Sequence, residues 1–279
     1  MTVADSPSRC VDAELVGRRD CGPDAFVLDL RLPEALPAAR PGRFAMLSPA
    51  DGTGPCIPRP FSLYDQPAPD RVTFLVQVMG KGTRALAALA PGAGVTCTLP
   101  LGNGFEVAAP EEEVVMVAGG VGSAPFLLYG RRRAEAAAGL SGGAAATHFL
   151  FGARSGERLY DRAAFDGMGL RTVLATDDGS VGFAGNVVRC LDAELEAGRI
   201  GADARFLACG PEGLLHGFAA FARERGLRAE LSLETYMGCG FGVCNACPVP
   251  TEPDGPLGAW PWARTCEAGP VFPLTAIRF

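Results

Sequence analysis

The cysteines near the carboxyl terminus constrain this chain more than any other feature. Four of its ten cysteines lie there, as Cys239, Cys244, Cys247 and Cys266. The segment from Thr235 onward is rich in Gly, Cys and Pro, shows almost no apolar periodicity, and is too short to bury a core of its own. Something other than hydrophobic burial must hold it. In a reducing compartment, clustered thiols are more often a metal site than a set of disulfides, so we expect a metal centre.

The spacing of these cysteines favours one kind of centre. Cys239–Cys247 has the pattern C-x4-C-x2-C, and Cys266 follows alone, which is the plant-type ferredoxin spacing for a [2Fe–2S] cluster. Gly238, Gly240 and Gly242 allow positive φ angles and let backbone N–H groups face the sulfurs. The alternative is a structural zinc site, but zinc ribbons favour two C-x2–4-C pairs. We therefore predict that these four cysteines ligate a [2Fe–2S] cluster.

Length and charge limit the remaining possibilities. At 279 residues, 48% of them hydrophobic, the chain has material for two domains and a small appendage. A formal charge of −6 without a basic run argues against a nucleic-acid partner. No stretch approaches the roughly 20 apolar residues of a membrane helix, and Met1–Asp5 does not begin like a signal peptide. We expect no membrane association and a cytoplasmic location.

The first part of the chain, to about Phe105, is typical of short strands separated by Gly and Pro turns. Many short strands of this kind predict a small antiparallel barrel. The expected strands are Ala25–Leu32, Gly42–Leu47, Val72–Met79 and Gly94–Leu99, with one helix over Thr83–Leu89.

The pattern changes at Glu113, where strands begin to alternate with helices. Val114–Ala118 is continuously apolar, as in a strand buried on both faces. Strand–helix alternation predicts βαβ units and a parallel sheet. Further strands are expected at Thr147–Phe151, Arg171–Ala175 and Arg205–Ala208, helices at about 123–138, 187–196 and 212–225, and a surface loop at 139–146. The predicted domains are a barrel over residues 1–107, an α/β domain over 108–233 and a cluster domain over 234–279.

A first candidate binding motif lies in the barrel. In Arg59-Pro60-Phe61-Ser62 the arginine is suited to a flavin pyrophosphate, because its fork makes bidentate, charge-assisted bonds, and Ser62 is suited to the flavin ring. On its own, this motif would equally fit an exposed arginine beside a turn that binds no ligand. Gly82-Thr83 adds support, since a Gly-rich turn opens a helix there and provides a phosphate site. Together the two segments predict an FAD site.

Two further motifs follow predicted strands of the α/β domain. Gly119, Gly120 and Gly122 precede a helix, so the backbone can approach a pyrophosphate at the helix N-terminus. They do not form the G-x-G-x-x-G fingerprint, and a tight turn without a ligand is the alternative. Cys209-Gly210-Pro211 follows another strand at the sheet edge where ligands bind. Its alternative is a buried Cys before a helix. We expect the nicotinamide cofactor at the Gly119–Pro125 face, with Cys209, Gly210 and Pro211 as further candidate contacts.

The only histidines, His148 and His216, fall in a predicted core strand and on a predicted helix, where a structural role is expected. The residues of Thr176-Asp177-Asp178-Gly179-Ser180 are typical of a turn. A role in binding the nicotinamide cofactor is the second interpretation of this segment.

The order of these motifs resembles the ferredoxin-NADP reductase superfamily. Within it, a cysteine cluster after the nicotinamide domain is similar to the electron transfer subunit of dihydroorotate dehydrogenase B. The resemblance extends from about Val11 to Phe279 and includes the Cys266–Phe272 ending. It implies that Arg59, Pro60, Phe61, Ser62, Gly82 and Thr83 contact FAD, together with the backbone of Leu75, Val76 and Gln77.

What the resemblance implies is an oxidoreductase subunit in pyrimidine (UMP) biosynthesis. A catalytic partner with FMN in a TIM barrel would oxidise dihydroorotate, in a heterotetramer of two of each chain. Electrons would pass singly through the [2Fe–2S] cluster to FAD and leave as a hydride to NAD⁺. The cofactors FAD, [2Fe–2S] and NAD carry this chemistry.

Some features leave alternatives open. The segment between Cys247 and Cys266 looks longer than the family usually shows, and its Trp260 and Trp262 are either a docking edge or a cap over the cluster. Arg154 and Ser155, after a predicted strand, would suit a 2′-phosphate and therefore NADP. One rival function is a related iron–sulfur flavoprotein subunit of the sulfide dehydrogenase or bifurcating ferredoxin:NADP reductase type. Another is a non-enzymatic adaptor with a zinc knuckle.

Overall fold

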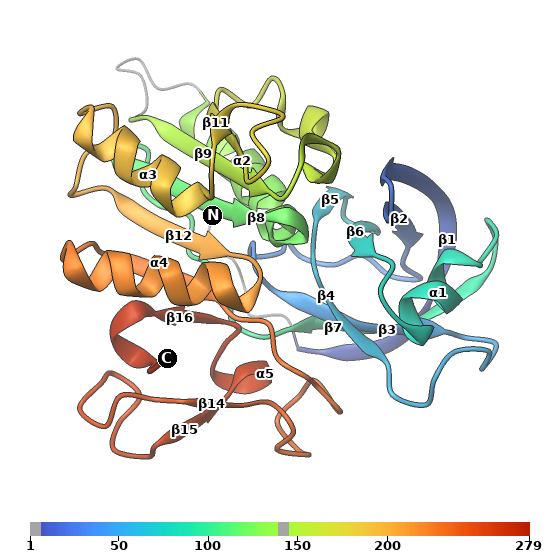
Figure 1. Cartoon of the computed structure of the whole chain (residues 1–279). Coiled ribbons are helices and arrows are strands. Elements are labelled where there is room, and N and C mark those ends of the chain that lie inside the picture. The colour runs from blue at the N-terminus through green and yellow to red at the C-terminus, as the bar shows by residue number, and fades with distance from the viewer. Residues whose placement is uncertain (1–6, 139–144) are drawn as a thin grey trace.

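The computed structural model describes residues 7–138 and 145–279. Two sheets lie side by side, and the carboxyl-terminal segment lies below them in Figure 1. Most of the expected 139–146 loop, residues 139–144, is outside the described residues.

The first sheet is antiparallel throughout, as the sequence predicted for the barrel. Its strand order is β4-β3-β7-β1-β2-β6-β5, and the curled sheet encloses buried residues such as Leu28, Phe74 and Leu99. Its elements are β1 (Arg9–Gly22), β2 (Ala25–Arg31), β3 (Phe44–Pro49), β4 (Arg59–Ser62), β5 (Asp65–Ala68), β6 (Arg71–Gln77), α1 (Lys81–Ala87) and β7 (Gly94–Leu101).

The second sheet has the order β11-β10-β9-β8-β12-β13-β16, parallel except for β16. Helices α3 and α4 cover one face and α2 the other (Figure 1). The middle elements are β8 (Val114–Gly119), α2 (Ala124–Ala137), β9 (Thr147–Ala153), β10 (Arg171–Thr176), β11 (Phe183–Ala184), α3 (Val187–Glu196), β12 (Arg205–Cys209), α4 (Glu212–Glu224) and β13 (Ala229–Ser232).

Strand β8 explains why this sheet needs a continuous apolar run. Val115 and Val117 pack into the core under α3 and α4, whereas Met116 and Ala118 pack into the core under α2. Successive side chains of a strand point to opposite faces, so every position is buried when helices cover both. The predicted parallel α/β sheet is confirmed.

The tail is more regular than its sequence indicated. It forms β14 (Pro248–Pro250), β15 (Trp262–Arg264), α5 (Thr265–Ala268) and β16 (Val271–Pro273). Strand β16 pairs antiparallel with β13, and Thr251 forms a bridge to Ile277. The segment that carries the four cysteines, here called the cysteine segment (residues 234–279), is therefore joined through β16 to the second sheet, which is the middle sheet of the molecule. The proposed boundaries at 107/108 and 233/234 stay a prediction.

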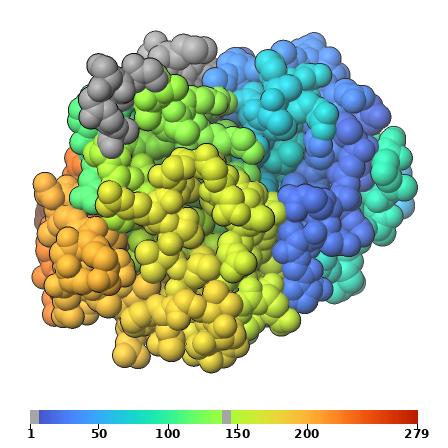
Figure 2. Space-filling view, turned by 90° about the horizontal axis from the view of Figure 1, so that it is seen from above, coloured from blue at the N-terminus to red at the C-terminus, as the bar shows by residue number. Residues whose placement is uncertain are grey.

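The barrel and the α/β sheet touch directly. In Figure 2 the yellow-green segment between β9 and β10 lies against the blue strands at the start of the chain, where the Asp161 carboxylate accepts two hydrogen bonds from the Arg19 guanidinium. Across residues 7–138 and 145–279, no helix has both the length and the hydropathy required to cross a bilayer.

Candidate functional site

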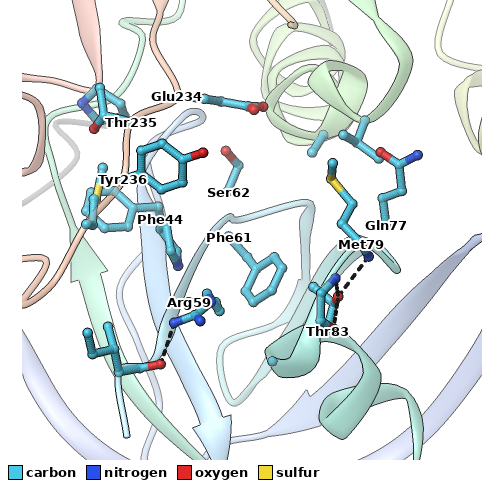
Figure 3. Close-up of a pocket in the computed structure, with 18 of the residues that line it drawn as sticks. Phe44, Arg59, Phe61, Ser62, Gln77, Met79, Thr83, Glu234, Thr235 and Tyr236 are labelled. Carbon is cyan, nitrogen blue, oxygen red and sulfur yellow. Dashed lines mark hydrogen bonds between the residues drawn. The ribbon is translucent and has the colours of Figure 1, made fainter. Parts of the chain in front are cut away.

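A cavity of about 690 Å³ lies where the barrel, the α/β sheet and the cysteine segment meet (Figure 3). The barrel contributes residues of β4, β6 and the turn into α1. The turn after β8 and the start of α2 contribute Val121 and Ala124, and the cysteine segment contributes Gly238 and Ala246. Of the residues predicted to bind FAD, those that line this cavity are Arg59, Pro60, Phe61, Ser62, Leu75, Gln77, Gly82 and Thr83.

Arg59 reaches its position because of the glycine opposite it. A Cβ on Gly82 would lie 2.9 Å from Arg59 Cγ, so only glycine lets the arginine stem pass. Its guanidinium donates to the Ile57 carbonyl at 2.7 Å. The remaining N–H groups of the fork are suited to an anionic group such as a pyrophosphate.

The Thr83 hydroxyl makes its hydrogen bonds within this turn. Its hydroxyl accepts from the N–H groups of Met79 and Gly80 at 2.9 and 3.0 Å, and donates to the Gly80 carbonyl at 3.1 Å. These bonds fix the approach into α1.

Strand alternation separates the predicted residues of β6. Leu75 and Gln77 line the cavity, whereas Val76 is fully buried in the barrel core. A contact from Val76 to a bound flavin is therefore confined to its backbone. The side chain of Gln77 is available to the cavity.

The sequence reasoning missed three residues that follow β13. Glu234, Thr235 and Tyr236 line the cavity, and Figure 3 shows Glu234 and the Tyr236 ring beside Ser62. Glu234 is accessible through the cavity, yet the surrounding protein raises the pKa of its carboxyl. Their position in the sequence could have identified them, because they directly follow the carboxyl end of a parallel strand, where ligands of such sheets bind.

The two motifs predicted for nicotinamide binding are adjacent. A Cβ on Gly122 would lie 2.4 Å from the Cys209 carbonyl oxygen, and one on Gly119 would lie 3.0 Å from Pro211 Cδ. Both motifs end neighbouring strands, β8 and β12, at which the strand order reverses. Ligands of open α/β sheets bind at such switch points. The assignment of Gly119, Gly120, Gly122 and Cys209–Pro211 to NAD stays a prediction.

The four predicted metal ligands come together as two pairs. The Cys247 and Cys266 sulfurs are 3.2 Å apart and buried against Phe44 and Met46 of the barrel. The other pair, Cys239 and Cys244, is linked by backbone N–H···S bonds of 3.3 and 3.5 Å, and Cys244 is exposed.

Backbone donors surround the Cys239 sulfur. Burial raises the pKa of this thiol, but N–H groups of Cys244, Phe241 and Val243 outweigh that effect and lower the pKa to about 6. Burial raises the pKa of Cys266 to about 12, although the Gly242 N–H donates to its sulfur at 3.1 Å. Donors that stabilise sulfur anions are suited to a metal–thiolate centre.

The arrangement of the sulfurs in two pairs bears on the choice between a [2Fe–2S] cluster and a structural zinc site. A [2Fe–2S] cluster takes two protein ligands on each iron, whereas structural zinc draws four ligands around one ion. The paired sulfurs and their N–H donors fit the binuclear cluster.

The two histidines have the structural surroundings expected from the sequence. Buried His148 hydrogen-bonds Glu113 at 2.8 Å, and Glu113 in turn accepts from the Gly201 N–H at 3.2 Å. His216, on α4, lies against the Phe279 ring.

Known proteins match this arrangement over nearly the whole chain. Residues 234–278 match the family model described as the iron–sulfur cluster binding domain of dihydroorotate dehydrogenase B. The electron transfer subunit of dihydroorotate dehydrogenase B (NAD(+)) from Desulforamulus reducens is 30% identical over 267 residues, which is 95% of this chain and 97% of the relative. The same subunit from Shouchella clausii is 33% identical over 263 residues, or 93% and 95%.

The chain belongs to the family of dihydroorotate dehydrogenase B electron transfer subunits. The resemblance inferred from the motifs is confirmed.

Solved structures agree with this family assignment. The NADH-dependent reduced ferredoxin-NADP oxidoreductase, studied for flavin-based electron bifurcation, is 25% identical with a TM-score of 0.80, covering 95% of this chain and 89% of that one. A ferredoxin NADP⁺ reductase from Neisseria gonorrhoeae has a TM-score of 0.63 at 18% identity, over 79% and 93%, and shares the fold. The family fold is therefore that of a ferredoxin reductase with an added cluster segment.

Proposed function

We propose that this chain is the electron transfer subunit of an NAD⁺-linked dihydroorotate dehydrogenase, an oxidoreductase of pyrimidine biosynthesis. It receives the electrons released when a catalytic partner oxidises dihydroorotate and delivers them to NAD⁺. One observation carries the proposal. Gly238 and Ala246 of the cysteine segment line the same cavity as Arg59 and Ser62, so the predicted cluster and flavin sites share a wall.

The residues divide the task of holding the cofactors. Arg59 and the turn at Gly82 would hold the pyrophosphate of FAD, and Ser62 and Gln77 would contact its polar groups. The four cysteines would hold the cluster. When bound, these groups supply the conversion between single electrons and the hydride that nicotinamide accepts.

Glu234 gives the site a proton-binding group. Its carboxyl lies in the cavity beside Ser62 (Figure 3), and its raised pKa keeps it able to bind a proton at higher pH than a glutamate surrounded by water. Apolar side chains of Phe44, Phe61 and Leu75 line the same space.

The partner we propose is an FMN-containing catalytic subunit, in an assembly of two chains of each kind in the cytoplasm. The exposed Cys244 marks the side from which electrons enter. Phe241 and Val243 flank it and are 57% and 72% exposed, so a partner covers apolar surface when it approaches this edge.

The NADH-dependent ferredoxin-NADP oxidoreductase supplies a second candidate, since it matches 95% of this chain with a TM-score of 0.80. In that case the partner would be another subunit of a ferredoxin-NADP oxidoreductase rather than an FMN barrel. The identity of the partner decides between the two.

The test is NAD⁺ reduction by dihydroorotate. The chain is co-expressed with the FMN-containing dihydroorotate dehydrogenase of the same organism, and NADH formation is followed by absorbance. We expect turnover with the wild-type chain and with Cys10→Ser, an exposed cysteine on β1, and loss of nearly all of it with Cys244→Ser, which removes a cluster ligand. Turnover that persists in Cys244→Ser, or none with wild type, would contradict the proposal.

A further inference from the structure

The segment that connects β9 and β10 packs against the barrel close to the cavity. Tyr160, in the segment between β9 and β10, packs its ring onto Gly22 at the end of β1. A Cβ at Gly22 would lie 2.5 Å from a ring carbon, so glycine is required for this approach. The contact brings the Tyr160 hydroxyl to Asp24 and Gln77 of the barrel.

The Tyr160 hydroxyl uses its whole hydrogen-bonding capacity here. It donates to the Asp24 carboxylate, and it accepts from Gln77 Nε2 at 3.1 Å and from Arg158 Nη1 at 3.0 Å. A hydroxyl has one donor and two acceptor positions, so none is left over. Burial raises the pKa of Tyr160 to about 12, which keeps the hydroxyl protonated and donating at neutral pH.

The Gln77 amide is oriented by this network. Its Nε2 donates to Asp24 Oδ2 at 2.9 Å as well as to Tyr160, so both amide hydrogens are engaged. Gln77 also lines the cavity, and Figure 3 shows its amide oxygen on the cavity side and its nitrogen on the far side. Among the described residues, no group is found donating to that oxygen.

We propose that Tyr160 is a positioning residue of the flavin site: with Asp24 it holds both Gln77 amide hydrogens and so presents the Gln77 oxygen to the cavity as a hydrogen-bond acceptor. The group that it would accept from is an N–H or O–H of the bound flavin nucleotide. This inference rests on the proposed function in one respect, because it takes the cavity to be the FAD site.

A second tyrosine provides the matched control. Tyr64 is also buried and also joins the two sheets, since its hydroxyl donates to Asp161 Oδ2 at 2.8 Å. Among the described residues its hydroxyl bonds Asp161 and not Gln77, and Tyr64 is not one of the residues that line the cavity. Tyr64→Phe and Tyr160→Phe therefore each remove one hydroxyl from the same contact between sheets, but only Tyr160→Phe removes a hydrogen-bond partner of the Gln77 amide.

The experiment measures FAD affinity by quenching of flavin fluorescence on flavin-free protein. Without the Tyr160 hydroxyl, one amide hydrogen loses its acceptor and the amide is held through Asp24 alone. We expect Tyr160→Phe to raise the FAD dissociation constant about five-fold, the value of one net hydrogen bond, and Tyr64→Phe to change it less than about two-fold. In a Gln77→Ala background, Tyr160→Phe should have no further effect.

Each outcome decides something. Equal weakening by the two tyrosine variants would overturn the proposal in favour of general loosening between the sheets. A five-fold effect that survives in Gln77→Ala would also overturn it, because the effect would not act through the amide. A wild-type chain that binds no FAD would remove the proposed function itself, and the positioning role with it.

Discussion

Among single residues, Glu234 shows how a cavity changes the chemistry of an ordinary side chain. It follows β13 and lies beside Ser62, and no hydrogen bond or ion pair to its carboxylate is found among the described residues (Figure 3). Surrounding protein disfavours the charged form, so its pKa in the folded chain is above its ordinary value. The site therefore contains a carboxyl that takes up a proton more readily than a glutamate surrounded by water.

This shift predicts a pH dependence of stability in the flavin-free protein. Below the unfolded pKa of about 4.3 the carboxyl is protonated in both states, and its contribution to stability is fully present. As the pH rises toward the higher folded-state pKa, the unfolded chain releases its proton first and the folded state loses stability. Glu234→Gln cannot ionise, so we expect its melting temperature to exceed that of wild type at pH 8 and the difference to shrink toward pH 4.

Melting curves measured by circular dichroism between pH 4 and 8 check this expectation. Parallel profiles of wild type and Glu234→Gln over that range would show that the carboxyl titrates normally.

At the scale of elements, the close contact between the ends of β8 and β12 forms the candidate nicotinamide site. Gly122 has no room for a side chain, because a Cβ would meet the backbone of Cys209 and Gly210 at 2.4 and 2.5 Å. Backbone cannot move aside as a flexible side chain can. The glycine is therefore required by packing, whether or not a pyrophosphate lies beside it.

We expect Gly122→Ala to destabilise the protein by about 1–3 kcal/mol, as overpacking does, and to weaken NADH binding by separating the two loops. Gly213→Ala is the matched control, since Gly213 lies in α4 with nothing within 4 Å of its Cβ position. In a helix, alanine should stabilise by about 0.5–1 kcal/mol. Urea unfolding and NADH titration measure both effects, and equal effects of the two changes would refute the packing argument.

Elements with a clear period were predictable from sequence, and their physical reasons are visible. Val114–Ala118 is apolar throughout because helices cover both faces of its strand, and α3 falls at Val187–Glu196 as expected. Strand β1 was missed, because Arg18, Arg19 and Asp20 in its second half face outward and carry no apolar alternation. Strand β16 is three residues long, and only its pairing with β13 identifies it.

The site was predictable to the extent that local motifs define it. The FAD and cysteine motifs carry their chemistry in adjacent residues, and most of the predicted FAD residues do line one cavity. Glu234 and Tyr160 belong to no motif. They reach the site through long-range pairing of strands and contact between the two sheets, which no local pattern in the sequence reports.

For the whole molecule, the cysteine segment is placed between the cavity and the surface. Gly238 and Ala246 border the cavity while Cys244 is exposed, so a bound cluster would have one side toward the flavin and one toward a partner. The hairpin of β14 and β15 continues this surface, since Arg264 donates to Asn245 Oδ1 at 2.9 Å. Trp260 and Trp262 are 73% and 50% exposed, which favours the docking edge over the cap.

We expect Trp260→Ala with Trp262→Ala to weaken binding of the catalytic subunit about ten-fold or more, because exposed tryptophans are frequent interface anchors. Leu257→Ala, in the same insert, should weaken it less than about three-fold, since leucine is under-represented among such anchors. Isothermal titration with the catalytic subunit gives both values, and flavin content verifies folding. Unchanged affinity in the tryptophan variant would place the docking edge elsewhere.

The most direct measurement is the cofactor content of the chain after anaerobic reconstitution with iron, sulfide and FAD. Two sulfur pairs beside a flavin-sized cavity predict two irons and two acid-labile sulfides per chain, about one FAD, and a reduced-state EPR signal that Cys244→Ser alters and Cys10→Ser does not. A colourless chain that binds a single zinc and neither iron nor flavin would contradict the account.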